Sequence, residues 1–213
     1  MKALVTGGAG FIGSNLVDEL VKENEVVVID NLSTGNAHFV NKKARFYNCD
    51  ITNGDHVKKI FEMEKNFDYI FHLAAQVSVP DSVTDPVFDA RINILGILNL
   101  LKESAKIDLK KFIFSSSGGA IYGEADEIPT PEEYPINPIS PYGISKYVSE
   151  KYLYFFKREY GIDYTILRYA NIYGPRQGLS KESGVISIFV QKFVKNEIPV
   201  IFGDGSAVEI MFM

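Results

Sequence analysis

The sequence is poor in features that mark secreted, metal-binding or nucleic-acid-binding proteins. Its single cysteine, Cys49, cannot form an internal disulfide and indicates a reducing compartment. Lys and Arg number 22 against 27 Asp and Glu, and a net charge of -5 argues against a surface for nucleic acid or anionic membranes. The histidines His38, His56 and His72 are not spaced as metal ligands, so we predict no metal site.

Long apolar runs and a leader-like segment are also missing from the sequence. No run approaches the roughly 20 apolar residues that a membrane span requires. A strand pattern over residues 2–6 follows Met1 at once and leaves no room for a signal peptide. We therefore expect a cytoplasmic protein with neither a membrane nor a nucleic acid as its partner.

Short apolar runs alternate with helical patterns along the chain. The runs 26–29 and 112–114 are apolar without alternation, as expected for strands covered on both faces. This order predicts an α/β fold with a doubly wound parallel sheet and right-handed crossovers. The predicted strands span residues 2–6, 25–30, 44–50, 69–74, 111–116 and 163–168, with a last strand at 200–202. The predicted helices span residues 13–24, 53–65, 87–105, 142–160 and 184–196.

A glycine-rich turn follows the first predicted strand. Gly7, Gly10 and Gly13 form a G-x-x-G-x-x-G arrangement between a strand and a helix. In this context the first glycine permits a tight turn, the second lets the backbone approach a pyrophosphate, and the third lets helix and strand pack closely. The phosphates would bind the free amides at the start of the helix, around Phe11 and Ile12. We predict a dinucleotide site; the alternative is a glycine-rich turn without a ligand.

Acidic residues end the second and third predicted strands. Asp30 lies about 20 residues beyond the glycine turn, where an acid binds the adenosine ribose and repels a 2′-phosphate. This position favours NAD over NADP, and the alternative is that Asp30 caps the next turn. Asp50 and Ile51 are placed to flank the adenine, although Asp50 could equally be the N-cap of the next helix.

Two further groups of residues could carry chemistry. Tyr142 and Lys146 are four residues apart on one helix face. A nearby ammonium and a positive nicotinamide ring would lower the tyrosine pKa from its ordinary value near 10 and make the phenol a base. Ser115, Ser116 and Ser117 end the fifth strand, at the sheet edge where such folds bind ligands. The alternatives are a chance spacing in a tyrosine-rich helix and a serine-rich turn.

The motifs occur in one order along the chain. The glycine turn is followed by Asp30, Asp50-Ile51, the segment HLAA (72–75), the serines, the Tyr142–Lys146 pair and the segment RYANIYGPR (168–176). Together they resemble the extended short-chain dehydrogenase/reductase family, specifically its UDP-glucose 4-epimerase-like nucleotide-sugar enzymes. The resemblance covers residues 1 to about 205. It implies a Rossmann NAD-binding domain over residues 1–175 and part of a substrate-binding lobe over residues 176–213.

The resemblance also implies a reaction and a set of site residues. Hydride would pass from sugar C4 to NAD and return to the other face of a 4-keto sugar. Tyr142 would be the base, Lys146 would position it and hold the nicotinamide ribose, and Ser117 would bridge the reacting oxygen. Counting from the strand gives Ser117 and counting back from Tyr122 gives Gly118; Ser116 is the alternative hydroxyl.

The remaining implied contacts concern the cofactor, the substrate and a second subunit. The cofactor contacts are Gly7, Gly10, Phe11, Ile12, Gly13, Asp30, Asn31, Asp50, Ile51, Leu73, Ala74, Ala75, Asn93, Ser115, Tyr142, Lys146 and Tyr169. The substrate contacts, for a UDP-hexose, are Gln76, Ser78, Ser117, Asn171 and Arg176. Asn93, in an otherwise apolar helix, would brace the site through a hydrogen bond; the alternative is an asparagine on the helix surface. The helices 87–105 and 142–160 would form a homodimer.

The sequence departs from the family pattern in two places. Gly118, Gly119 and Ala120 stand where the related dehydratases and decarboxylases carry an acid, which favours epimerisation or simple oxidoreduction. The turn 203–205 is not followed by the arginine that such enzymes carry, and we expect a C-terminally truncated form. Three functions stay open: a catalytic nucleotide-sugar 4-epimerase, a truncated NAD-binding protein with weak catalysis, and a reductase of another nucleotide sugar.

Overall fold

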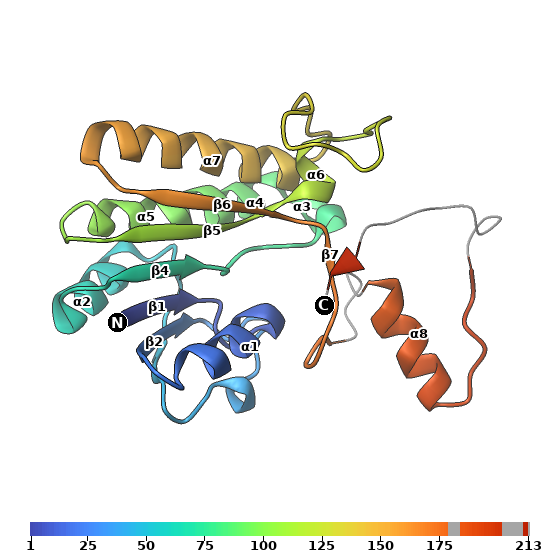
Figure 1. The fold of residues 1–213 in the computed structure, drawn as a ribbon, viewed down its shortest axis with the longest axis horizontal. Helices are drawn as coiled ribbons and strands as arrows, with labels where there is room; N and C mark the ends of the chain where they lie inside the picture. Colours follow the sequence, from blue (N-terminus) through green and yellow to red (C-terminus); the bar gives the residue numbers. More distant parts are fainter. Residues whose placement is uncertain (179–183, 202–210, 213) are drawn as a thin grey trace.

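A six-stranded parallel sheet forms the centre of the molecule (Figure 1). The computed structural model describes residues 1–178, 184–201 and 211–212. The strand order is β3-β2-β1-β4-β5-β6, which is the order of a Rossmann fold and confirms the predicted fold class. The strands are β1 (Lys2–Thr6), β2 (Glu25–Asp30), β3 (Arg45–Asn48), β4 (Tyr69–His72), β5 (Lys111–Ser117) and β6 (Tyr164–Tyr169).

Helices cover both faces of this sheet, and the apolar runs of the strands follow from that cover. In β2, Val27 and Ile29 face one core cluster, whereas Val26 and Val28 face the other. The first cluster packs against α2 (Gly54–Glu64), α5 (Gly96–Ser104) and α7 (Pro141–Tyr160), and the second against α1 (Phe11–Leu20). Because successive side chains point to opposite faces, a strand buried on both sides needs apolar residues at every position.

Local polar contacts set the ends of the predicted helices. The Asn53 side chain accepts a hydrogen bond from the His56 amide and begins α2. Helix α1 ends at Leu20, four residues before the predicted end, and the Asn24 side chain donates to the Leu20 carbonyl at 2.9 Å. This bond stabilises a turn at 21–24, where the prediction of continued helix is wrong.

The predicted helix 87–105 consists of three segments. It begins with α4 (Pro86–Ala90), passes through a π-helical segment (Arg91–Leu95) and continues as α5. A Cβ atom on Gly96 would lie 2.5 Å from Cδ1 of Ile51, so the glycine lets α5 pack closely against the end of β3. Single π-helical turns inside α-helices occur frequently at functional sites.

Two short helices were not expected from the sequence. Helix α3 (Val79–Thr84) follows β4, and the Ser78 hydroxyl caps it by accepting from the Asp81 amide at 3.2 Å. Helix α6 (Gly118–Ile121) follows β5 directly and lies beside the start of α7 (Figure 1). A short 3-10 turn (Ala37–Phe39) lies between β2 and β3.

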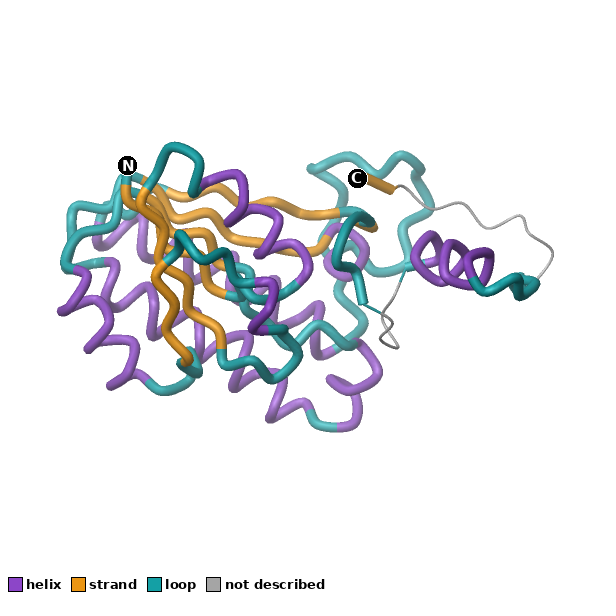
Figure 2. The backbone as a smooth tube through the Cα atoms, turned by 90° about the horizontal axis from the view of Figure 1, so that it is seen from below, coloured by secondary structure: helices purple, strands orange, loops and turns teal. Residues whose placement is uncertain are grey.

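The last part of the chain lies beside the sheet layers (Figure 2). Helix α8 (Val185–Val194) falls within the predicted helix 184–196. A small parallel pair joins β7 (Asn171–Ile172) to β8 (Met211–Phe212). Val200 and Ile201 lie outside any strand, so the predicted strand is wrong there, and Phe202 and the 203–205 turn lie outside the described residues. No helix among the described residues is long and apolar enough to cross a membrane.

Candidate active site

The glycine turn connects β1 to α1 at the carboxyl edge of the sheet. Gly7 has φ +73, and a Cβ atom on it would lie 2.7 Å from the Ala74 amide nitrogen. A Cβ atom on Gly13 would lie 2.1 Å from the Gly7 carbonyl oxygen. Side chains at these positions would therefore disrupt the turn or force α1 away from β1. The tight turn and the close helix packing predicted for these two glycines are both present.

The first turn of α1 is open to an anionic ligand. Its N-cap is Gly10, which provides no side-chain cap, and the first turn carries no acidic side chain. Amides at a helix start bind anions because they point along the positive end of the helix dipole. The cradle formed by Gly7, Gly10 and Gly13 therefore fits the pyrophosphate of a dinucleotide.

Asp30 has a local role at the end of β2. Its carboxylate accepts from the Ala9 amide at 3.0 Å and from the Leu32 amide at 2.8 Å, and the residue is buried. Asp30 thus caps the turn, as the alternative interpretation holds. Each carboxylate oxygen keeps a second lone pair, so a ribose hydroxyl could still bind.

The structure tests part of the interpretation given to Asp50 and Ile51, which follow β3. Asp50 accepts from the Thr52 amide at 2.8 Å and from the Asn31 side chain at 3.4 Å. The N-cap of α2 is Asn53, so the alternative that Asp50 is the helix N-cap is wrong. Ile51 is buried in the core.

The end of β4 lies against the glycine turn. The Leu73 amide donates to the Thr6 carbonyl at 3.1 Å and the Ala74 amide to the Thr6 hydroxyl at 3.3 Å. Nδ1 of His72 lies 2.7 Å from the same hydroxyl. Burial lowers the pKa of His72 to about 3, which makes it a neutral structural residue and not an acid–base group at neutral pH.

The serines at the end of β5 face in opposite directions. Ser116 is buried and donates to Glu150 at 2.7 Å, whereas Ser115 and Ser117 lie on the other face of the strand. The Ser115 hydroxyl donates to the Tyr169 hydroxyl at 3.4 Å. Ser117 precedes α6 without making a side-chain cap. Ser116 is thus held in a structural hydrogen bond, and the role of Ser117 as the reacting hydroxyl stays a prediction.

Tyr142 and Lys146 occupy the first turns of α7. The Ser140 hydroxyl caps this helix, and the Tyr142 amide donates to the Ser82 hydroxyl of α3 at 3.2 Å. Nζ of Lys146 lies 5.7 Å from the Tyr142 ring centroid and donates to the Ser115 carbonyl at 2.8 Å. Helix α7 therefore brings the predicted base Tyr142 and the ammonium group of Lys146 together at the end of β5, where the serines lie.

Lys146 is a buried cation with a perturbed pKa. The residue is 5% exposed, and burial lowers its pKa to about 8 while Asp89 and Glu150 act in the opposite direction. These two carboxylates were not identified from the sequence. The signal for Asp89 was its place in a predicted apolar helix, four residues before Asn93; for Glu150 it was the same spacing after Lys146.

Asn93 and Gln76 connect the site to the π-helical segment. The Asn93 side chain accepts from the Gln76 amide at 3.0 Å and donates to the Gln76 carbonyl at 2.9 Å, which is the bracing role predicted for it. The Gln76 side chain donates to the Ser78 carbonyl at 2.8 Å. Since the side chains of Gln76 and Ser78 make internal bonds, their contact with a substrate stays a prediction.

The segment after β6 returns to α1. Arg176 forms an ion pair with Asp18 and lies 5.7 Å from the Phe39 ring centroid. The Asn15 side chain donates to the Pro175 carbonyl at 2.9 Å. Asn171 lies in β7, whereas the Arg176 side chain is bound to Asp18 of α1. Their binding roles stay predictions.

Cys49 is a free, buried cysteine. Burial raises the pKa of the Cys49 thiol to about 11, which agrees with an inert structural cysteine. Within the part of the chain that the structure describes, no group of three or more His, Cys, Asp or Glu side chains is arranged to hold a metal ion.

Comparison with known proteins identifies the family. Residues 3–209 match the model of the NAD dependent epimerase/dehydratase family. The chain belongs to this family. The match confirms the resemblance found in the sequence, and because the family is NAD dependent it supports the predicted cofactor.

Individual members of the family are closely similar over almost the whole chain. A UDP-glucose 4-epimerase from Mycolicibacterium smegmatis is 41% identical over 212 residues, 97% of this chain and 67% of its own length. The structure of a UDP-glucose 4-epimerase from Thermotoga maritima with UDP-glucose has a TM-score of 0.95 and 52% identity, covering 99% of this chain and 69% of that one. A Thermus thermophilus UDP-glucose 4-epimerase in complex with NAD has a TM-score of 0.88 and 44% identity, covering 94% and 64%. This chain therefore spans about two thirds of the length of these family members.

Proposed function

We propose that this chain binds NAD and carries the epimerisation at C4 of a UDP-hexose, of the UDP-glucose/UDP-galactose type, through a 4-keto intermediate. The observation that carries the proposal is the buried Lys146 ammonium, held between the Ser115 carbonyl and the Tyr142 ring at the carboxyl edge of the sheet. The named activities of the similar proteins from Mycolicibacterium smegmatis and Thermotoga maritima support the reaction and substrate class.

The cofactor would lie across the carboxyl edge of the sheet. Gly7, Gly10 and Gly13, with the amides of Phe11 and Ile12, would hold its pyrophosphate, and Asp30 its adenosine ribose. Further contacts would come from Asn31, Asp50, Ile51, Leu73, Ala74, Ala75, Asn93, Ser115 and Tyr169. When bound, NAD would accept a hydride from sugar C4 and later return it.

The protein's own groups would move the proton. The Tyr142 phenolate takes the proton of the sugar 4-hydroxyl, and the Lys146 ammonium stabilises that phenolate electrostatically. Ser117 hydrogen-bonds the reacting oxygen from the end of β5. Gln76, Ser78, Asn171 and Arg176 would orient the sugar nucleotide.

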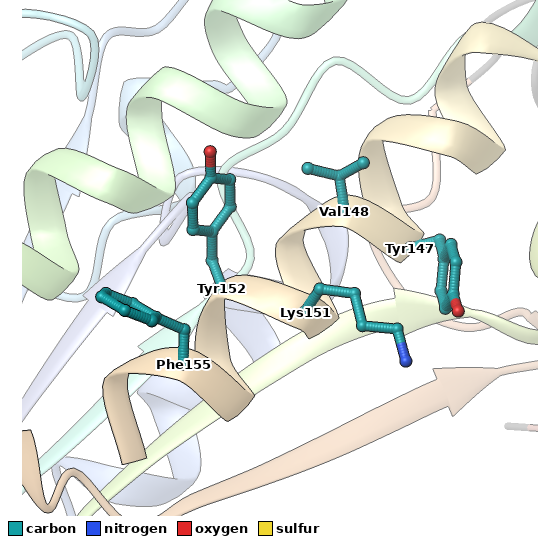
Figure 3. A pocket seen from close by; sticks show the side chains of 5 residues that line it. All are labelled: Tyr147, Val148, Lys151, Tyr152 and Phe155. Atoms are coloured by element: carbon teal, nitrogen blue, oxygen red, sulfur yellow. The ribbon is translucent and has the colours of Figure 1, made fainter. Parts of the chain in front are cut away.

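A homodimer is part of the same proposal. The outer side of α7 carries an apolar groove of about 340 Å³ lined by Tyr147, Val148, Lys151, Tyr152 and Phe155 (Figure 3). Nζ of Lys151 lies 4.8 Å from the centroid of the Tyr147 ring. The charged end of the lysine is therefore held against this ring, and the rest of the groove lining is apolar. A second copy of α5 and α7 would cover this surface.

A cytoplasmic location belongs to the proposal as well. The buried unpaired thiol of Cys49 suits a reducing compartment, and NAD and nucleotide sugars of galactose metabolism would both be available there.

Proton NMR of UDP-galactose incubated with the protein and a trace of NAD tests the activity. Appearance of the UDP-glucose anomeric signal is expected, without net consumption of reduced cofactor. Bound NAD without any conversion would instead support an NAD-binding protein that lacks turnover. Net consumption of NADH would support a nucleotide-sugar reductase. A 4-keto-6-deoxy product from dTDP-glucose would contradict the assignment by revealing dehydratase chemistry.

A further inference from the structure

The Lys146 ammonium is surrounded by groups from several elements. Asp89 comes from α4, Glu150 and Tyr142 come from α7, and His72 comes from β4. The ammonium also lies 5.0 Å from the centroid of the Phe114 ring on β5. His72 is neutral, so among these described groups the carboxylates of Asp89 and Glu150 are the ones that balance the positive charge of the buried ammonium.

Glu150 already has a cationic partner. Arg168 donates to it from Nε at 3.0 Å and from Nη2 at 2.7 Å, in a two-point ion pair that crosses from β6 to α7. The Ser116 hydroxyl also donates to Glu150, at 2.7 Å. The Glu150 charge is therefore neutralised by Arg168, and little of it is left to compensate Lys146.

Asp89 differs from Glu150 in its partners. Its carboxylate is fully buried and accepts hydrogen bonds from Ser145 Oγ, from Asn93 Nδ2 at 2.9 Å and from Gln76 Nε2 at 3.2 Å. All three donors are neutral, and no ion pair to Asp89 is present among the described residues. Burial raises the pKa of Asp89 above its ordinary value, while these hydrogen bonds and the Lys146 charge act to lower it. Because the charge of an ionised Asp89 meets no other cation in an ion pair among the described residues, it is left to compensate Lys146.

We infer that Asp89 is the positioning residue of Lys146: its buried charge keeps the ammonium protonated, and its hydrogen bonds fix the helix turn that carries the lysine. Ser145, which immediately precedes Lys146, is bound directly to the Asp89 carboxylate. The same carboxylate holds the segment after β4 through Gln76, so one charge orders both sides of the site.

The inference deepens the proposed function but can be tested without substrate or NAD. Lysine labelled at Cε and Nζ allows the titration of Lys146 to be followed by NMR, with Lys146→Met to assign its signal. In Asp89→Asn the titration midpoint should move down from about 8 by roughly one unit or more, because an opposite charge has been removed. A folded Asp89→Asn protein with an unchanged midpoint would overturn the inference.

A matched control separates charge from structure. Ser145→Ala removes one hydrogen bond to Asp89 but leaves both charges. The change in the Lys146 titration midpoint should therefore be a small fraction of the change in Asp89→Asn, even if the melting temperature falls. An equal shift in Ser145→Ala would show that only the local structure matters, which would also overturn the inference.

The unmodified protein provides a second test if Asp89→Asn does not fold. The carboxyl carbon of Asp89, observed in aspartate-labelled protein, should report an ionised group at pH 7; a protonated group at pH 7 would overturn the inference. If Lys146 shifts as expected but no epimerisation is found in the unmodified protein, the proposed function fails and the role of Asp89 stands.

Discussion

A substitution at the start of α7 should affect catalysis without affecting NAD binding. Tyr142→Phe removes one hydroxyl and leaves the ring beside Lys146. We expect epimerisation to fall by about 10²–10⁴-fold, the usual contribution of a positioned acid–base group. NAD should still bind, because the glycine turn is unchanged. Rates from proton NMR and NAD content after gel filtration measure the two effects.

A tyrosine on the same helix is the control for this substitution. Tyr154 is 61% exposed on α7, and Tyr154→Phe should leave the rate unchanged. If Tyr142→Phe turned over at the unmodified rate, Tyr142 would not be the base.

The two serines at the end of β5 should respond differently to removal of the hydroxyl. Ser117→Ala should lower the epimerisation rate at least about tenfold with little change in stability, because its hydroxyl makes no structural cap. Ser116→Ala should lower the free energy of unfolding by about 1.5–3 kcal/mol, because its hydroxyl donates to the buried Glu150 carboxylate. Rate measurements and urea unfolding on both variants check this, and a reversed pattern would assign the reacting hydroxyl to Ser116.

At the scale of secondary-structure elements, one carboxylate connects β1, β3 and the end of α2. The Glu64 side chain is 1% exposed and binds Lys2, Arg45 and Tyr47. Burial acts to raise the pKa of Glu64, but these three partners outweigh it and lower the pKa from 4.5 to about 2. A lowered pKa of this size corresponds to about 3 kcal/mol of stability, present above pH 4.5 and lost as the pH falls through 2.

Glu64→Gln should therefore lower the free energy of unfolding by about 3 kcal/mol at pH 7. The difference from the unmodified protein should shrink by about 1 kcal/mol at pH 3.5, where the unfolded chain already protonates the glutamate. Urea unfolding at both pH values measures it. Glu62→Gln, at an exposed site on the same helix, is the control and should change stability very little. A pH-independent difference would contradict the ion-pair explanation.

The predicted and observed secondary-structure elements differ where local polar contacts determine where a helix begins or ends. The strands were found because β2 and β5 are apolar runs, a signal that survives without knowledge of tertiary packing. Helix α3 was missed because it is short, although Ser78 followed by Pro80 is a start signal. The contact of Asp89 with Ser145 could not be predicted, since it joins residues far apart in sequence that the packing of α4 on α7 brings together.

At the scale of the whole molecule, the outer face of α7 predicts self-association. Phe155 is 46% exposed there and lines the groove of Figure 3. We expect a dimer in sedimentation velocity experiments. Phe155→Glu should shift it toward monomer, because two carboxylates would meet in an apolar contact. Lys157→Glu, near the end of the same helix and outside the groove, is the control for added charge. A monomer in the unmodified protein would remove the dimer from the proposal.

The central place of β1 has a consequence for synthesis on the ribosome. β1 is made first, but it lies between β2 and β4, and its partner residues on β4 end at His72. Translation proceeds at about 5–20 residues per second, so roughly 3–13 s pass between the synthesis of Thr6 and the synthesis of His72. Until then, one edge of β1 has no partner strand. During this interval an apolar strand edge is available to other nascent chains. We expect production of the protein to depend on chaperones that bind early in translation, more than its compact final sheet would suggest.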